Sequence, residues 1–437
     1  MAALRLAGPR SRQIFRKFFK PQAETKEQPF LLRYGHFISA AGETLDEVMA
    51  VYMPRGKSYT GLEQVEIFCH GGRRVVRLIL DQLIKGGARA AQPGEFTKLA
   101  FLNGRIDLAR AEAVAEIIAA NTDSSYKAGR EHLLGAYAGE IERLREHLVT
   151  VLADIEASID FSEEEIDPGT NVQHVGRLRE VQRQIEALLD SYTGGRIINE
   201  GFKIAIGGRP NAGKSSLFNL LLRQERALVN PEAGTTRDYL SEWIDLDGFA
   251  VNLIDTAGLR TGGSQVEKEG QARAEKIIEE SDLVLWMFDL AAKDWQESLK
   301  ADIGRLAYAP ILLVGNKIDV IADASPASLK VALETAIMSC LTKKGLKDLR
   351  QAVLWRIRAK MPDLTSGQVV TSARHQQKLD TARKAIKRTA QKLKANESPE
   401  ITAFELRQAV ESLDEITGRI YNEEILGKIF SSFCIGK

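Results

Sequence analysis

Long hydrophobic runs are missing from this chain, although 44% of its 437 residues are hydrophobic. No segment approaches the roughly 20 consecutive apolar residues that a membrane-spanning helix needs, which argues against a transmembrane protein. A strong net charge is missing as well, because the formal charge is only +1. A polyanionic partner would therefore have to bind a locally basic surface rather than the molecule as a whole.

Cysteine is scarce in this chain. The three cysteines, Cys69, Cys340 and Cys434, fit neither a disulfide framework nor the paired spacing of a zinc site. We therefore expect the protein to work in a reducing compartment, the cytoplasm. The basic segment before Glu24 superficially suits an organellar transit peptide, but the run ALRLAGP at 3–9 is typical of a short strand that enters a turn.

Hydrophobic patterning divides the chain into four segments. Residues 1–105 mix short strand-like runs with one helix, which predicts an α+β domain. Residues 106–200 are helical, and apolar residues from 141 to 159 recur at steps of three and four, as on one helix face. Residues 201–360 alternate apolar β-rich runs with helices, which predicts a largely parallel sheet covered on both faces. Residues 361–437 are helical again, so we expect an α/β domain inserted into a helical domain whose two halves pack together.

A phosphate-binding loop is predicted at 207–216, GGRPNAGKSS. It carries the pattern G-x-x-x-x-G-K-[ST] between a predicted strand and a predicted helix, the context that this motif requires. Glycines let backbone N–H groups close on phosphates, and the start of the helix favours negative charge. We expect Lys214 to reach the β and γ phosphates and Ser215 to hold Mg²⁺.

Three further motifs follow in the order of a guanine-nucleotide domain. GTTRD offers Thr235 and Thr236, of which Thr236 is the better candidate to complete the Mg²⁺ shell. DTAG ends a predicted strand, so Asp255 faces the metal and Gly258 lies near the γ-phosphate. NKID brings Asp319, which can accept two hydrogen bonds from guanine that adenine cannot donate. The predicted ligand is therefore GTP.

Two positions depart from the usual pattern. The Ser-Ala pair of guanine sites is replaced by Ser339-Cys340, where the small cysteine can fill the place of alanine. The glutamine that orients the attacking water in Ras-like proteins is replaced by the apolar Leu259. Another group must position the water and a cation must offset the developing charge, for which Asn211 and Glu267 are the candidates.

Motifs outside the nucleotide site carry a more specific resemblance. CHGG (69–72), PGEF (93–96), FLNGRIDLARAEAV (101–114) and the terminal FSSFCIGK, together with the GTPase motifs, resemble the MnmE (TrmE) family of tRNA-modification GTPases over nearly the whole chain. The resemblance implies a multidomain α/β plus α protein with an α+β folate-binding amino-terminal domain at 1–105. A discontinuous helical domain (106–200 and 361–437) and an inserted Ras-like P-loop GTPase domain (201–360) would follow.

The family resemblance also implies an activity. Members form homodimers through the amino-terminal domain and act with the flavoprotein MnmG, which alone carries FAD. Together they add an aminomethyl-type group to carbon 5 of the wobble uridine (U34) of certain tRNAs. The carbon comes from 5-formyl- or 5,10-methylene-tetrahydrofolate, and a potassium-stimulated GTPase cycle with G-domain dimerisation paces the reaction.

Residue roles carry over from the family by position. Glu267 matches the glutamate that orients the attacking water, and K⁺ replaces an arginine finger with Asn211, Asn230, Glu232 and Thr235 as its ligands. The folate contacts are Arg5, Glu66, Arg105 and Lys437, although some members carry lysine at position 105. The motifs and the resemblance together give these GTP-binding residues: Asn211, Ala212, Gly213, Lys214, Ser215, Ser216, Asn230, Pro231, Glu232, Ala233, Gly234, Thr235, Thr236, Asp255, Thr256, Ala257, Gly258, Asn316, Lys317, Asp319, Ser339 and Cys340. Members carry one more strand and a glycine-rich turn before ALRLAGP, so we expect a misassigned or shortened start here, which bears on folate binding and dimer packing.

The carboxyl-terminal cysteine has three interpretations. A lipid anchor is the poorest, because Gly436 and Lys437 do not fit a prenylation signal, so no membrane anchor is expected. A buried, inert thiol is the second, since free cysteine commonly behaves as a small hydrophobe. The third, which the resemblance suggests, places the Cys434 thiolate near the folate pocket, where it assists the chemistry.

A basic segment at 371–395 holds eight Lys and Arg residues against Asp380 alone. On a helix it forms either a cationic surface for tRNA phosphates or a solubilising face. A different class of function stays open as well, a GTP-dependent assembly factor that binds ribosomal RNA. Such factors normally attach an RNA-binding module such as KH, and no GXXG loop in a KH-like context is evident.

Overall fold

The computed structural model describes residues 1–23, 27–160, 168–228, 240–256, 264–305, 309–321, 334–361, 368–434 and 436. The chain divides into two compact units. One holds Met1–Ala115, His132–Asp154 and Leu406–Lys437, and the other holds Glu116–Glu131 and Ile155–Glu405. The four domain boundaries predicted from the sequence stay a prediction, because helical segments before and after the inserted segment contribute to both units.

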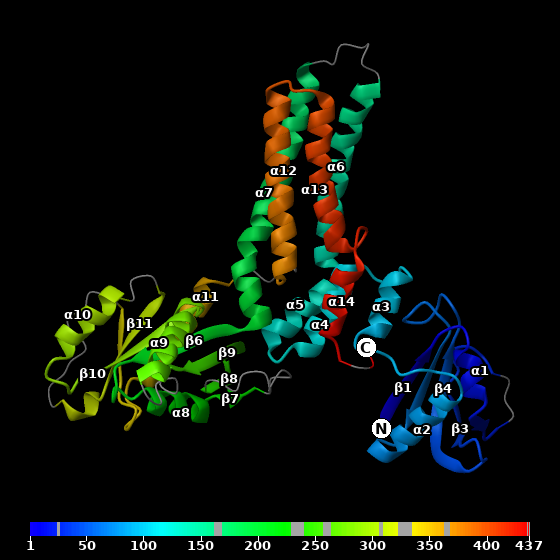
Figure 1. Ribbon diagram of the computed structural model, residues 1–437, viewed down its shortest axis with the longest axis horizontal. Coiled ribbons are helices and arrows are strands. Elements are labelled where there is room, and N and C mark those ends of the chain that lie inside the picture. Colours follow the sequence, from blue (N-terminus) through cyan, green and yellow to red (C-terminus); the bar gives the residue numbers. More distant parts are fainter. Residues whose placement is uncertain are drawn as a thin grey trace. The chain divides into compact units, whose positions relative to one another are not determined.

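A five-stranded antiparallel sheet with the order β1-β5-β4-β3-β2 forms the amino-terminal part of the first unit (Figure 1). The strands are β1 (Ala2–Ala7), β2 (Phe19–Pro21), β3 (Arg33–Ile38), β4 (Thr44–Met53) and β5 (Gln64–Cys69). Alternate residues of β4, Val48 and Ala50, share a core with Ile14 of α1 (Ser11–Arg16) and Ile79 of α2 (Arg73–Lys85). Cys69 is buried in the same core, so it serves as a small packing residue.

Helices complete the first unit. It contains α3 (Glu95–Leu102) and α14 (Glu423–Ser431), together with parts of α4 (Leu108–Ala119), α6 (Ala136–Asp160) and α13 (Pro399–Thr417). The helix face predicted at 141–159 is confirmed over α6, where Ile141, Leu144, Leu148 and Val151 are fully buried.

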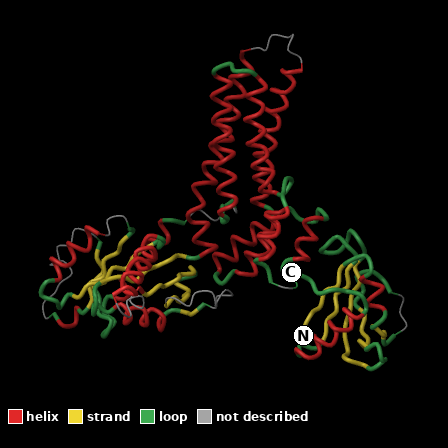
Figure 2. Tube along the Cα trace, viewed as in Figure 1, coloured by secondary structure: helices red, strands yellow, loops and turns green. Residues whose placement is uncertain are grey.

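Two long helices run side by side in the second unit, α7 (Pro168–Glu200) and α12 (Ala373–Lys394) (Figures 1 and 2). A short helix, α5 (Asp123–Leu134), belongs to both units. Gly195 of α7 permits close approach, because a Cβ there would lie 2.1 Å from the carbonyl oxygen of Val370. Helices from both sides of the inserted segment therefore pack together, as predicted.

The inserted segment is a seven-stranded sheet with the order β12-β11-β10-β6-β9-β8-β7. Its strands are β6 (Phe202–Gly208), β7 (Arg226–Ala227), β8 (Leu240–Leu246), β9 (Phe249–Asp255), β10 (Leu283–Asp289), β11 (Ile311–Asn316) and β12 (Thr335–Ile337). The five strands from β12 to β9 are parallel, which confirms the largely parallel prediction, whereas β8 and β7 add an antiparallel edge.

Helices cover both faces of this sheet, as predicted. They are α8 (Lys214–Gln224), α9 (Ser264–Glu279), α10 (Trp295–Arg305) and α11 (Leu346–Ala359), with a 3₁₀ turn, η2 (Ile318–Val320). Leu217 of α8 and Val353 of α11 belong to the core on one face, while Ile278 of α9 and Leu299 of α10 belong to the smaller clusters on the other. Within the described residues, no helix has the length and apolar character needed to cross a membrane.

Candidate functional site

The predicted phosphate loop joins β6 to α8. Three of its residues have positive φ angles, Gly208 (138°), Asn211 (63°) and Gly213 (101°). Two of them also need the small size of glycine, since a Cβ at Gly208 would lie 2.2 Å from the carbonyl oxygen of Met287 and one at Gly213 would lie 2.2 Å from Nδ2 of Asn316. The conformation and the spacing of this loop therefore require its glycines.

Lys214 and Ser215 point to functional neighbours. Lys214 is 7% exposed, and its Nζ donates to the carbonyl oxygen of Arg209 at 2.8 Å, inside the loop. Ser215 Oγ donates to Oδ2 of Asp255 at 3.0 Å, and Asp255 is 1% exposed. The first residue of α8 that carries a hydroxyl thus meets the last residue of β9.

This pair fits the oxygen chemistry of Mg²⁺, which prefers hard oxygen ligands and usually shares them with substrate phosphates. Among the described residues, no three or more His, Cys, Asp or Glu side chains form a group that could hold a metal ion. In the part of the chain that the structure describes, Ser215 and Asp255 are the oxygen donors that such a metal could use beside the phosphates of the nucleotide, while the predicted ligand Thr236 lies outside the described residues.

Asn316 ties the phosphate loop to the predicted guanine pocket. Its side chain is buried; Nδ2 donates to the carbonyl oxygen of Ala212 at 2.9 Å, and Oδ1 accepts from the backbone N–H of Cys340 at 3.0 Å. Lys317, in the left-handed region at φ 69°, donates to Oδ2 of Asp289 at 2.6 Å. The NKID motif is thus anchored to the phosphate loop, to Cys340 and to the end of β10.

Asp319 and Cys340 lie close enough to influence each other. Asp319 lies in η2, which follows β11, and it is exposed, so its carboxylate can be reached by a base. Burial, and to a lesser extent the negative charge of Asp319, raises the pKa of the Cys340 thiol to about 11. Ser339 is fully buried, and its Oγ accepts from the backbone N–H of Thr342 at 3.0 Å. The structure therefore brings together NKID and the Ser-Cys pair that the sequence suggested.

Several predicted site residues lie outside the described residues. These are Asn230, Pro231, Glu232, Ala233, Gly234, Thr235, Thr236, Ala257, Gly258 and Lys437, as well as Leu259. Glu267 lies in α9, and its side chain is not among those described. The roles given to these residues stay predictions.

Two side chains that the sequence did not single out support the nucleotide site. Asp302 of α10 accepts from Nε and Nη2 of Arg209, both at 3.1 Å, and from Nε1 of Trp286 at 3.2 Å. Asp289 holds Lys317. Neither had a local signal, because Asp302 lies 93 residues from Arg209 and Asp289 lies 28 residues from Lys317 in the chain. Thr256, by contrast, donates its hydroxyl to the carbonyl oxygen of Ile206 at 2.9 Å, so that side chain holds the sheet together.

A second candidate site lies on the amino-terminal sheet of the first unit. Arg5 and Glu66 face each other across β1 and β5, and Arg5 Nε donates to Oε1 of Glu66 at 3.0 Å. The Arg5 guanidinium lies over the rings of Tyr59 and Phe96, at 5.1 and 5.4 Å from their centroids. Arg105 Nη1 donates to the carbonyl oxygen of Gly56 at 3.2 Å. Of the four predicted folate contacts, Arg5 and Glu66 therefore bond to each other, and Arg105 bonds to the loop at 54–61.

A cavity of about 640 Å³ opens beside Arg5, the first member of this pair. Arg5 and Phe96 line it, as do apolar residues of α2 such as Leu80 and Ile84, and Gly436 from the carboxyl terminus. Lining of this kind, mostly apolar with a few charged groups, is typical of small-molecule sites.

The carboxyl-terminal helix packs on the segment FLNGRIDL. Phe101 and Leu108 form one apolar cluster with Leu426, Phe430 and Phe433. Lys98 donates to Glu423 at 2.9 Å. The two motifs that carry the resemblance most specifically therefore meet in space. Cys434, just beyond this cluster, is exposed, so its interpretation as a buried, inert thiol is wrong.

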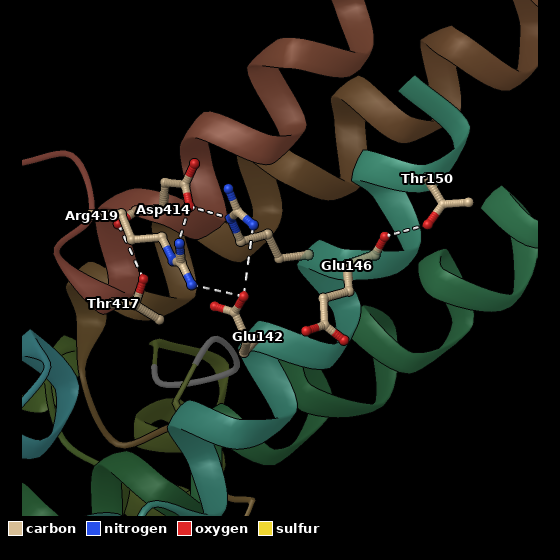
Figure 3. A network of polar contacts seen from close by, with 7 residues as sticks. Glu142, Glu146, Thr150, Asp414, Thr417 and Arg419 are labelled. Carbon is tan, nitrogen blue, oxygen red and sulfur yellow. Dashed lines mark hydrogen bonds and ion pairs between the residues drawn. The ribbon is translucent and has the colours of Figure 1, made fainter. Parts of the chain in front are cut away.

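A polar network fixes the turn that leads into α14 (Figure 3). The Asp414 carboxylate accepts from Arg145 Nε, and Arg419 Nη2 donates to Glu142 at 2.9 Å. The Asp414 carbonyl oxygen accepts from the backbone N–H groups of Gly418 and Arg419, both at 2.9 Å. Asp414 is buried, and such charge-assisted bonds are stronger than neutral ones. The end of α13 is therefore held on α6, which sets where α14 begins.

A parallel sheet with a glycine-rich loop at a helix start, a Ser–Asp oxygen pair and a buried NKxD asparagine define a P-loop GTPase. Comparison with known proteins shows to which family of GTPases this chain belongs. The family described as the MnmE helical domain matches residues 108–434, and the GTP-binding protein TrmE N-terminus matches residues 1–105.

Curated relatives match over nearly their full length. The tRNA modification GTPases MnmE of Akkermansia muciniphila and Aquifex aeolicus are each 39% identical over 438 residues, covering 100% and 99% of this chain and 96% of each relative. MnmE of Symbiobacterium thermophilum is 37% identical over 446 residues, covering 99% of this chain and 96% of the relative. The solved G domain of the T. maritima FeoB iron transporter covers 36% of this chain and 98% of its own at 26% identity, with a TM-score of 0.28 that is too low to carry structural weight. The chain belongs to the MnmE family of tRNA modification GTPases.

Proposed function

We propose that this GTPase paces the addition of an aminomethyl-type group to carbon 5 of the wobble uridine (U34) of certain tRNAs, together with the flavoprotein MnmG. The observation that best supports this is that one unit holds the Arg5–Glu66 pair, a cavity lined by Arg5 and Gly436, and the carboxyl-terminal segment that carries Cys434. A nucleotide switch alone has no use for such a site. FAD would reside on the partner only.

In the GTP cycle, Ser215 and Thr236 would hold Mg²⁺, which neutralises phosphate charge when bound. Asn211, Asn230, Glu232 and Thr235 would hold K⁺, which supplies the positive charge of an arginine finger. The Asn211 side chain is exposed and makes no hydrogen bond within the described residues, so its amide is available. Glu267 would orient the attacking water.

In the amino-terminal unit, Arg5, Glu66, Arg105 and Lys437 would contact 5-formyl- or 5,10-methylene-tetrahydrofolate. A carboxylate beside a guanidinium offers both an acceptor for the N–H groups of a pterin and a cation for a folate carboxylate. Tyr59 and Phe96 hold the guanidinium in place. The proposed homodimer forms through 1–105, and the proposed compartment is the cytoplasm.

Several cations of the tRNA surface proposed at 371–395 are already paired with carboxylates. Arg383 and Lys384 pair with Asp380, Arg388 pairs with Glu405, and Lys392 pairs with Glu397. Lys387 and Lys394 are exposed and make no ion pair within the described residues. They are the first cations of α12 to test as phosphate contacts.

Cys434 provides a direct test of the covalent chemistry. In a strain that lacks the native gene, the Cys434→Ser variant should turn over GTP normally but leave U34 unmodified, because the thiol is removed without disturbing the nucleotide site. Mass spectrometry of tRNA nucleosides measures the outcome. Full modification by the variant would remove Cys434 from the mechanism.

Complementation with the unchanged chain tests the proposed function itself. Restored wobble-uridine modification is the expected result. Normal tRNA nucleosides in the deletion strain, together with abnormal ribosomal particles, would instead favour the assembly factor.

A further inference from the structure

Gln64 lies directly behind the Arg5–Glu66 pair. It is the first residue of β5 and is 0% exposed. Residues two apart in a strand point to the same face of the sheet, so the side chains of Gln64 and Glu66 are neighbours. Gln64 Nε2 donates to Oε1 of Glu66 at 3.0 Å, and Gln64 Oε1 accepts from the Thr60 hydroxyl at 3.2 Å.

The donors around Glu66 converge on one of its two oxygens. Oε1 receives Arg5 Nε at 3.0 Å, Arg5 Nη2 at 2.9 Å and Gln64 Nε2 at 3.0 Å. Oε2 makes no hydrogen bond or ion pair within the described residues. Three donors on one oxygen fix the rotation of the carboxylate, so the direction of Oε2 is fixed as well.

Stability alone does not explain a glutamine here. A buried amide whose hydrogen bonds are all made contributes little net free energy compared with an apolar side chain of similar shape, and β-branched residues suit a strand better. The amide nevertheless joins two functional parts, the Glu66 carboxylate and the loop at 54–61. That loop is held again by Asn103 Nδ2, which donates to the carbonyl oxygen of Thr60 at 2.9 Å.

We propose that Gln64 is a positioning residue of the one-carbon site. It holds Glu66 so that Oε2 is the single acceptor offered to the N–H groups on the amino-pyrimidinone edge of a reduced pterin. This inference rests on the proposed folate binding. Arg5 neutralises the carboxylate, while Gln64 sets its direction.

The test measures binding of 5-formyl-tetrahydrofolate and of its 2-desamino analogue to the full-length protein by calorimetry. Gln64→Leu nearly keeps the volume and removes the hydrogen bonds to Glu66 and Thr60, as well as the long one to Met53 Sδ at 3.9 Å. We expect about 3- to 10-fold weaker binding of the natural ligand. The ratio of the dissociation constants of the two ligands should shrink towards one, because a mobile carboxylate no longer favours the ligand that carries the amino group. A purely structural role would weaken both ligands equally.

Two further variants keep the test decisive. Gln82→Leu removes another buried glutamine of the same unit, whose Oε1 accepts from the Ala40 N–H at 3.1 Å, and should leave the ratio unchanged. Thr60→Val leaves Gln64 in place but removes the hydroxyl that donates to it, together with that hydroxyl's bonds to Ser58 and to the Leu62 N–H. It should shift the ratio in the same direction as Gln64→Leu but less. GTP turnover should be normal in all three.

The possible failures are distinguishable. If the unchanged protein binds no reduced folate, the proposed function fails. If it binds the folate and Gln64→Leu keeps the same ratio between the two ligands, the inference about Gln64 is overturned while the proposed function stands.

Discussion

At Gly94, a substitution to alanine should displace the carboxyl-terminal helix, α14, from the rest of its unit. It caps the start of α3 at φ 65°, and an added Cβ would lie 2.7 Å from the Phe430 carbonyl oxygen and 3.0 Å from Phe430 Cβ. Gly104, just beyond the other end of α3, has nearly the same angle, 67°, and nothing within 4 Å of an added Cβ. The two alanine substitutions therefore share the backbone strain and differ in the steric contact.

The expected magnitude follows from these contacts. Alanine in the left-handed region costs about 1–2 kcal/mol at either position. At Gly94, α14 must also move away, which exposes part of Phe430 and Phe433, now 3% and 6% exposed. Losing the burial of about one such ring costs a further 2 kcal/mol or so, within the range of about 1.5–3 kcal/mol for a large apolar side chain. A difference of about 2 kcal/mol corresponds to a roughly 30-fold change in the equilibrium constant for local opening of α14.

Hydrogen exchange of the α14 amides measures this local opening. Gly94→Ala should exchange roughly 30-fold faster there than Gly104→Ala, while both variants keep GTP turnover, because the nucleotide site belongs to the other unit. Wobble-uridine modification should fall in Gly94→Ala only. Equal exchange rates in the two variants would refute the claim that Gly94 holds α14.

Three other predictions concern the nucleotide site. Asp319→Asn should weaken GTP binding by about 10-fold or more, because a charged acceptor for guanine is lost. The variant should bind xanthosine triphosphate better than GTP. If a competition assay shows that it still prefers GTP, Asp319 does not recognise the base. With its pKa at about 11, Cys340 should be mostly neutral thiol at pH 8. Because only the thiolate reacts, it should be alkylated by iodoacetamide about 100-fold more slowly than free cysteine. Peptide mass spectrometry over time measures this rate, and a fast reaction would contradict the burial of the thiol. Asp302→Asn should weaken GTP binding by about 5-fold, because the half-exposed Arg209 loses its charged partner on α10; an unchanged dissociation constant would show that the loop holds its shape without this pair.

Local features of the chain were predictable to a large extent from its sequence. The glycine-rich loop, NKID and the strands that precede them have signals within a few residues, because turn chemistry and hydrophobic periodicity are local properties. The buried face of α6 and the mostly parallel inserted sheet followed from the same patterns. The antiparallel β8–β7 edge did not, since no motif marks it.

Contacts between distant segments could not be read from spacing. Arg145 and Asp414 are 269 residues apart, and Asn316 lies 104 residues from the Ala212 carbonyl that it contacts. The same limit applied to the α12 cations, whose acidic partners partly lie on other segments, and to Cys434, whose exposure depends on how α14 docks.

The sequence by itself thus determined which chemistry the protein carries: a guanine-nucleotide loop, a family signature and a terminal cysteine. Only the tertiary structure decided which of these groups meet, that FLNGRIDL holds the terminal helix and that Arg5 pairs with Glu66, 61 residues away in the chain. The physical reason is that side-chain type and local periodicity are written along the chain, whereas long-range contacts depend on how packed helices and strands return to one another in space.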